Sequence, residues 1–140
     1  MRVMKLIQVE IPNGEVVTFR QMDDGTFCCP VCGLGGATGP SWDPPTDDGG
    51  DATPTLDTCP CCNTEYGFDD GIGPASPIGQ QEENWRRLCI EWLVREKWSD
   101  SAVNQLENLG INSEEVAECR RHWLREQEHR QGAAQAKSES

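Results

Sequence analysis

The chain has 140 residues, of which 36% are hydrophobic, and it contains 14 glycines, nine prolines and eight cysteines. This length accommodates one domain, or two small domains that share a surface, and it leaves little apolar material for a core. A small domain of that composition needs a staple, either a disulfide or a metal ion, and eight cysteines can supply either one.

The formal net charge of −12 is unevenly distributed along the sequence. Residues 41–79 contain eight acidic side chains and no lysine or arginine, so this segment carries two thirds of the excess charge. Contacts with a phosphate backbone require clustered lysine and arginine side chains, which this segment lacks. The charge distribution therefore argues against nucleic acid as a partner.

The beginning of the sequence indicates neither export nor membrane insertion. Residues 1–11 alternate between apolar and polar types and are too short for the apolar region of a signal peptide. No run in the sequence approaches the ~18 apolar residues that a membrane-spanning helix needs. We therefore expect a cytoplasmic protein, whose cysteines serve as metal ligands because a reducing compartment disfavours disulfides.

Residues 3–22 are predicted to form a β-hairpin. Asn13-Gly14 separates two runs of β-strand character, and this dipeptide tolerates positive φ at both central positions of a type I′ turn. Such a turn sets Ile11 opposite Val16, which places apolar side chains on both faces of the hairpin. We therefore expect the hairpin to be covered on more than one side.

Two Cys-x-x-Cys turns, spelled CPVC and CPCC and separated by 26 residues, are the strongest motif in the sequence. Two intervening residues let both sulfurs of one turn point at one ion, and four thiolates form a closed tetrahedral shell suited to zinc or iron. The residue after each turn needs a left-handed backbone, which Gly33 and Asn63 tolerate. The predicted metal ligands are Cys29, Cys32, Cys59 and Cys62.

The segment between the two turns, residues 33–58, is rich in Gly, Pro, Asp and Thr and predicts a long loop that the metal closes at both ends. Trp42 is interpreted as a partly buried anchor of this loop. The acidic residues lack the ligand alternation of a calcium-binding loop and are interpreted as solvated, with calcium binding as the alternative. Cys28 and Cys61 are interpreted as thiols that point away from the metal, and a role as alternative ligands or redox-sensitive thiols stays open.

From residue 80 onwards the apolar spacing is helical and predicts a cap of about three short helices, followed by a polar tail without fixed structure. The cysteines of this part, Cys89 and Cys119, are interpreted as buried core residues and its histidines as surface residues. As an alternative, Cys119 and His122, spaced i,i+3, could share a metal with Cys89. The expected helix boundaries are Ser99 or Asp100 as the second N-cap, Gly110 as its C-terminal stop, and Asn112 or Ser113 as the third N-cap, with Glu115 able to complete a capping box.

The cysteine turns, CPVCG at residues 29–33 and CPCCN at residues 59–63, resemble those of the rubredoxin-like and zinc-ribbon group. Residues 59–70, CPCCNTEYGFDD, are similar to CPCCGTEFGYDD in small uncharacterised bacterial proteins that also carry CPVCG and a tryptophan-containing helical tail. Asn63 stands where those proteins have glycine. The resemblance implies a metal-binding family and brings no established activity with it.

Together these features predict an α+β protein in three segments. Residues 1–78 form the β-hairpin and a rubredoxin-like zinc ribbon with four cysteine ligands, residues 79–130 form the helical cap, and residues 131–140 form a disordered tail.

We expect one structural zinc ion as the cofactor, with iron as the alternative. A closed four-cysteine shell has no open coordination position, which argues against hydrolytic chemistry at the metal. Iron in the same shell implies a rubredoxin-like one-electron carrier. Thiol–disulfide exchange is disfavoured because neither cysteine pair precedes a convincing helix. No catalytic triad, phosphate-binding loop or acid–base carboxylate pair stands out, so we do not expect an enzyme.

The favoured function is binding of another protein through the acidic loop and the helical cap. The acidic surface suits a basic partner, and an inhibitor or immunity-type role is one form that this could take. Tryptophan is enriched at interface hot spots, and Trp98 is expected to be the most exposed one because it ends its helix. The expected contact residues are Trp98, Asp47, Asp48 and Asp51.

Overall fold

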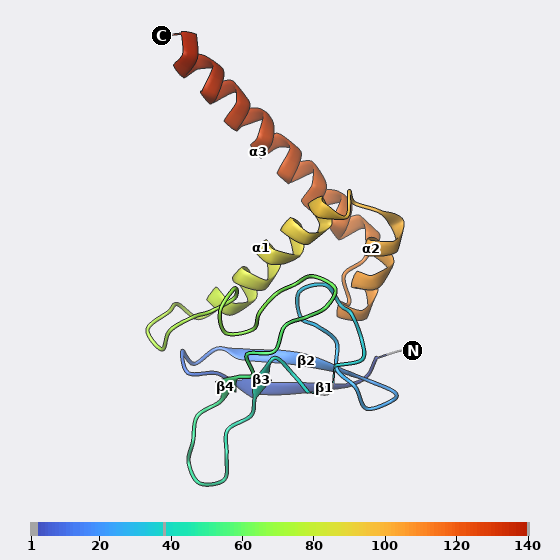
Figure 1. Ribbon diagram of the computed structural model, residues 1–140, viewed down its shortest axis with the longest axis vertical. Coiled ribbons are helices and arrows are strands. Elements are labelled where there is room, and N and C mark those ends of the chain that lie inside the picture. Colours follow the sequence, from blue (N-terminus) through green and yellow to red (C-terminus); the bar gives the residue numbers. More distant parts are fainter. Residues whose placement is uncertain (1–2, 38, 140) are drawn as a thin grey trace.

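A computed structural model describes residues 3–37 and 39–139 of the chain (Figure 1). The fold mixes α and β elements, as predicted, with two small antiparallel sheets and three α-helices. No helix among the described residues is long and apolar enough to cross a membrane. In chain order the elements are β1 (Val3–Glu10), β2 (Val16–Met22), β3 (Trp42–Asp43), β4 (Thr53–Pro54), α1 (Gln80–Arg95), α2 (Asp100–Leu106), the short 3-10 helix η1 (Glu107–Leu109) and α3 (Ser113–Glu139).

The turn of the β1–β2 hairpin differs from its prediction. Gly14 N donates to Ile11 O at 2.9 Å, and Gly14 has a φ of +88°, whereas Asn13 does not adopt positive φ. The connection is therefore a three-residue loop that ends in a left-handed glycine, and not a two-residue type I′ turn. The extra residue shifts the register by one, so that Glu10 lies opposite Val16.

This shift decides which side of the hairpin is buried, because a one-residue slip moves every side chain of a strand to the other face. Val9, Ile11, Val17 and Phe19 are all buried, whereas Val16 is 51% exposed. The apolar side chains therefore gather on one face against the rest of the molecule. Met22, at the end of β2, is the exception: it is buried against Cys28 on the other face, so the expectation that the hairpin is covered on more than one side holds at that end only.

Helix α1 is fixed to the hairpin by one buried carboxylate. The side chain of Glu15 accepts hydrogen bonds from the backbone N–H groups of Gly79 at 2.9 Å, Gln81 at 3.1 Å and Glu82 at 3.1 Å. These donors belong to the first turn of the helix, which has no intrahelical acceptor for them, and a negative charge is favourable there. Gly79 is the N-cap residue and has no side chain to cap the helix itself. The hairpin supplies the cap instead.

A second buried polar network joins the long loop to α1. Trp42 Nε1 donates to Gln81 Oε1 at 2.9 Å, Gln81 Nε2 donates to Asp70 O at 2.9 Å, and Trp85 Nε1 donates to Asp70 Oδ2 at 2.6 Å. Burial raises the pKa of the Asp70 carboxyl, and the hydrogen bond from Trp85 opposes that shift. Trp42 is buried, and it anchors the loop as predicted. The short β3–β4 ladder, which the sequence did not predict, holds the same loop at its middle.

The helix boundaries follow the predicted caps. Ser99 Oγ accepts from Ala102 N at 3.2 Å, Asn112 Oδ1 accepts from Glu115 N at 2.9 Å, and Gly110 ends η1 with a φ of +75°. Buried residues of the helices and of the cysteine turns belong to one hydrophobic core. The cap and the cysteine-containing half are therefore packed together as one body.

Helix α3 is much longer than predicted. It has 27 residues, about 40 Å at the rise of an α-helix, and it projects from the body in Figure 1. The helix continues through residues 131–139, which were predicted to belong to a disordered tail, and Ser140 lies outside the described residues. Three of the four residues 133–136 are alanine, the residue with the strongest helix propensity, which favours this continuation.

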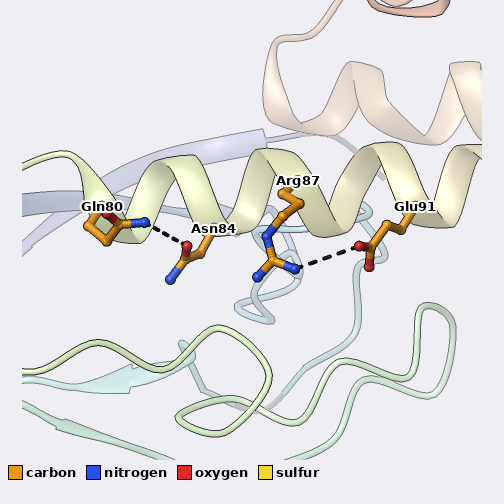
Figure 2. Close-up of polar contacts among 4 residues, drawn as sticks. All are labelled: Gln80, Asn84, Arg87 and Glu91. Atoms are coloured by element: carbon orange, nitrogen blue, oxygen red, sulfur yellow. Dashed lines mark hydrogen bonds and ion pairs between the residues drawn. The ribbon is translucent and has the colours of Figure 1, made fainter. Parts of the chain in front are cut away.

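The side of α1 opposite its buried face carries polar pairs at helical spacing (Figure 2). Gln80 Nε2 donates to Asn84 Oδ1 at 2.9 Å, and Arg87 Nη1 lies 3.6 Å from Glu91 Oε1. Residues four apart on a helix face one another, and an exposed ion pair such as that of Arg87 and Glu91 contributes only a few tenths of a kcal/mol. The opposite side of α1 is apolar, and there the rings of Trp85 and Phe19 meet edge to face with centroids 6.1 Å apart.

Candidate metal centre

Four buried thiols meet between the two cysteine turns. The sulfur atoms of Cys29, Cys32, Cys59 and Cys62 all lie within 4.8 Å of one another. Cys29 Sγ is 3.7 Å from Cys62 Sγ, and Cys32 Sγ is 3.7 Å from Cys59 Sγ. A disulfide would bring a pair to about 2 Å, so the sulfurs are not bonded to each other. A tetrahedron with metal–sulfur bonds of about 2.3 Å has edges of about 3.8 Å, which matches the observed spacing.

The two turns have the same backbone structure. Gly33 N donates to Cys29 O at 2.9 Å, and Asn63 N donates to Cys59 O at 2.9 Å. Gly33 has a φ of +81° and Asn63 has a φ of +63°, so both adopt the left-handed backbone that was predicted for them. Position 33 also requires glycine for steric reasons, because a Cβ there would lie 2.6 Å from Gln105 O in α2. Helix α2 can approach the first turn only because this residue is glycine.

Hydrogen bonds to sulfur support the thiol positions. Val31 N donates to Cys29 Sγ at 3.4 Å, and Cys62 Sγ lies 3.2 Å from Thr64 Oγ1. The thiol of Cys62 donates to the hydroxyl in the protonated state, and the hydroxyl can donate in return once the thiolate forms. Each turn thus holds one of its sulfurs through a local polar group.

The four thiols cannot all ionise without a compensating charge. Hydrogen bonds with Cys29, Cys59 and Cys62 raise the pKa of the Cys32 thiol, and burial raises it further. Hydrogen bonds from Cys29 and Cys32 lower the pKa of Cys62 to about 7. Burial also raises the pKa of Tyr66, and the neighbouring Cys29 adds to that shift. A divalent cation bound between the sulfurs would supply the missing positive charge, because metal binding displaces the thiol protons.

The helical cap holds the carbonyl groups of both turns. Arg95 Nη2 donates to Cys62 O at 2.8 Å, and Asn108 Nδ2 donates to Gly33 O at 2.9 Å. Gln105 Nε2 donates to the carbonyl of the second cysteine of the first turn, Cys32, at 3.0 Å. Arg95, Gln105 and Asn108 could not be predicted as site residues from the sequence, because they lie 33 to 75 residues from their acceptors and follow no motif. Such outer contacts orient metal-binding groups and tune their affinity.

The two additional cysteines of the turns lie outside the cluster, as interpreted. Cys28 is buried, and its Sγ donates to Met22 Sδ at 3.0 Å. Burial raises the pKa of the Cys28 thiol, which keeps it protonated. Cys61 is half-buried, and its Sγ accepts from Gln105 Nε2 at 3.3 Å.

The helical cysteines do not form a second centre. Among residues 3–37 and 39–139, the four-cysteine cluster is the one group of three or more cysteine, histidine or acidic side chains with metal-binding spacing. Cys89 is buried, and burial raises its pKa to about 12, with the nearby Cys119 adding to the shift. His122 is exposed and pairs with Glu126 at 3.3 Å. The interpretation of Cys89 as a core thiol therefore agrees with its environment.

The expected contact residues lie on two separate parts of the molecule. Asp47, Asp48 and Asp51 are exposed on the loop that joins β3 to β4, and Asp48 accepts a hydrogen bond from the Thr46 hydroxyl. In Figure 1 this loop extends below the hairpin, at the opposite end of the molecule from α3.

Trp98 lies in the helical cap and is half-buried. It packs against Trp123 with ring centroids 6.3 Å apart. The acidic loop and Trp98 therefore do not form one continuous surface.

Comparison of the chain with known proteins found no matching family model, no matching curated sequence and no matching solved structure. The function is therefore argued from the geometry and chemistry of the site. Four close, buried cysteines of the right spacing are consistent with metal binding.

Proposed function

We propose that the protein is a metal-stapled interaction module, in which one zinc ion bound by Cys29, Cys32, Cys59 and Cys62 organises a surface for binding another protein. The observation that carries the metal site is the buried cluster of four sulfurs with tetrahedral spacing. All four positions of the shell belong to the protein, so no coordination site is left for a substrate. The role of the ion is then structural, as in a zinc ribbon of the rubredoxin-like group.

Zinc is favoured over iron by the surroundings of the cluster. The four cysteines are at most 4% exposed, and the helical cap covers both turns through Arg95, Gln105 and Asn108. An electron carrier needs its centre close to a surface where a redox partner can approach. The alternative, a rubredoxin-like one-electron carrier with an iron centre held by four cysteines, keeps the same ligands.

The partner is expected to be a basic protein in the cytoplasm. Residues 41–79 contain eight acidic side chains and no basic one, and the three aspartates of the β3–β4 loop are exposed. Complementary charge accelerates association and selects partners. An inhibitor or immunity-type binder is one form of this function, and the resemblance to small bacterial proteins with the same cysteine turns is compatible with it.

Metal analysis of the purified protein tests the site. We expect about one zinc ion per chain and no visible absorption, and a strong chelator should abolish the cooperative unfolding transition. A red protein with visible charge-transfer bands would favour the iron alternative. A protein that keeps its fold and its thermal transition without any metal would contradict a structural role for the ion.

The interaction is tested by affinity capture from cells with the metal-loaded chain as bait. A triple variant, Asp47→Asn, Asp48→Asn and Asp51→Asn, keeps the size of the loop and removes three charges. We expect a basic protein that the wild-type chain retains and the variant loses, and purified samples of both proteins should reproduce that difference by calorimetry. Equal calorimetric affinity of the partner for both baits would contradict the role of the acidic loop.

A further inference from the structure

Two large apolar side chains are exposed on neighbouring loops beside the second cysteine turn. Phe68 is 76% exposed and Leu56 is 63% exposed. The two loops pack tightly, since a Cβ on Gly67 would lie 2.5 Å from Pro54 Cβ and 3.0 Å from Leu56 Cδ2. Leu56 also has a φ of +65°, a backbone conformation that costs energy for a residue with a side chain. Phe68 and Leu56 are therefore held in solvent-exposed positions by two closely packed loops.

Exposed acidic side chains lie on the same two loops as this pair. Asp57, Glu65 and Asp69 are exposed on the same two loops, and Glu65 N donates to Asp69 Oδ2 at 2.7 Å. No lysine or arginine occurs between residues 41 and 79. We refer to the surface formed by Leu56, Phe68, Asp57, Glu65 and Asp69 as the acidic–apolar patch. Its chemistry fits a segment that offers an apolar side chain flanked by positive charges.

Helix α3 carries a segment of that kind. Leu124 is 44% exposed, and Arg120 and Arg121 stand four and three residues before it, so the three side chains lie on one face of the helix. Residues 119–131 contain four arginines and two glutamates, a net charge of +2 in a chain whose total is −12. We refer to Arg120, Arg121 and Leu124 as the basic α3 face.

One copy of the chain cannot bring these two surfaces together. Helix α3 projects from the body in Figure 1, whereas residues 55–70 form loops between β4 and α1. The side of α3 that faces the molecule is occupied by Trp123, which packs on Trp98. Among the described residues, neither arginine of the basic α3 face forms an ion pair.

We propose that the basic α3 face of one copy docks on the acidic–apolar patch of a second copy. Leu124 contacts Phe68 and Leu56 of the other copy, and the two arginines pair with its carboxylates. Two such contacts related by a twofold axis close the assembly as a dimer. This inference goes beyond the proposed function, because the partner is the chain itself and the patch lies on different loops from Asp47, Asp48 and Asp51.

The test is the oligomeric state of the metal-loaded full chain, measured by sedimentation velocity over a range of concentrations at low and high salt. We expect a concentration-dependent dimer that dissociates at high salt, because exposed ion pairs are screened. Phe68→Asp and Leu124→Asp should each raise the dissociation constant roughly tenfold or more. Ile78→Asp changes an equally exposed apolar residue, 74% exposed, outside both surfaces and should leave the dimer intact.

A mixing experiment separates this contact from any other. The Phe68→Asp chain keeps a working α3 face, and the Leu124→Asp chain keeps a working patch, so an equimolar mixture retains one of the two contacts. We expect each variant alone to be monomeric and the mixture to form a 1:1 complex. Circular dichroism and metal content should match those of the wild-type chain, which excludes misfolding as the cause.

Three results would overturn the proposal. One is a wild-type chain that stays monomeric at every concentration in low salt. Another is a dimer that survives both substitutions, which would place the contact elsewhere on the molecule. The third is a mixture that fails to associate. None of these results affects the expected zinc content or the capture of a basic protein, so the proposed function is tested independently of the dimer.

Discussion

The cysteine turns and the helical cap are held in place in different ways. Each turn is built by contacts within six residues, such as the hydrogen bond from Gly33 N to Cys29 O and its equivalent from Asn63 N to Cys59 O. The cap is positioned by hydrogen bonds between groups 33 to 75 residues apart, from Arg95, Gln105 and Asn108 to the turns. Local contacts therefore shape each turn, whereas the meeting of the two turns at the candidate metal site and the position of the cap that covers it depend on residues 27 to 75 positions apart.

Loss of one cysteine of the cluster should have the largest effect on the molecule. Cys32→Ser removes one thiolate from the shell, and structural zinc contributes on the order of 10 kcal/mol of folding free energy in small domains. We expect the variant to lose the metal and the cooperative unfolding transition, as measured by metal analysis and circular dichroism.

The matched control for that substitution is Cys61→Ser, inside the second turn and outside the cluster. It should keep the full metal content and most of the stability. Equal loss of metal in the two variants would mean that the sulfurs are assigned to the wrong cysteines.

Removal of the buried carboxylate of Glu15 should have the next largest effect, because it separates the hairpin from α1. Glu15→Ala leaves the N–H groups of the first turn of α1 without an acceptor, and loss of an N-cap costs about 1–2 kcal/mol. Urea denaturation measures this difference in the free energy of unfolding. Glu10→Ala, at an exposed position of the same hairpin, is the control and should change the stability by less than about 0.5 kcal/mol.

Gln105→Ala tests whether the cap affects the metal site. The side chain bonds to Cys32 O and Cys61 Sγ, and loss of outer contacts of this kind typically costs about 10-fold to 100-fold in metal affinity. Competition with a chromogenic chelator measures the affinity. Asn104→Ala changes the adjacent, exposed residue of α2 and should leave the affinity unchanged. Indistinguishable affinities for the two variants would show that the cap covers the site without tuning it.

The features that could be predicted from the sequence are those that depend on neighbouring residues. The four clustered cysteines, the left-handed positions after each turn and the Ser99 cap all follow from spacing and backbone preference. The hairpin register also depends on neighbouring residues, those of the turn, but it was predicted wrongly. Pro12 precedes Asn13-Gly14, and proline is favoured at the first central position of a type I turn. A turn with Pro12 and Asn13 at its centre places Pro12 in the loop, which makes the loop one residue longer than predicted.

The remaining features could not be read from neighbouring residues. Glu15 caps a helix that begins 65 residues later, and no pattern in the sequence connects the two. The Trp42–Gln81–Asp70 network likewise joins three segments whose separation is known only once the chain is folded. Long-range polar contacts of this kind carry no periodicity, so they are found only in the structure.

The smallest effect is expected at the exposed ion pair of α1 in Figure 2. Arg87 and Glu91 are 56% and 58% exposed, and pairs of this kind on a helix contribute roughly 0.3–0.5 kcal/mol. Arg87→Ala should therefore lower the free energy of unfolding by no more than that, and added salt should remove the difference. Denaturation at low and at high salt measures both values. A larger loss of unfolding free energy that persists at high salt would contradict this assignment. It would mean that Arg87 stabilises the helical cap through a buried contact and not through an exposed ion pair.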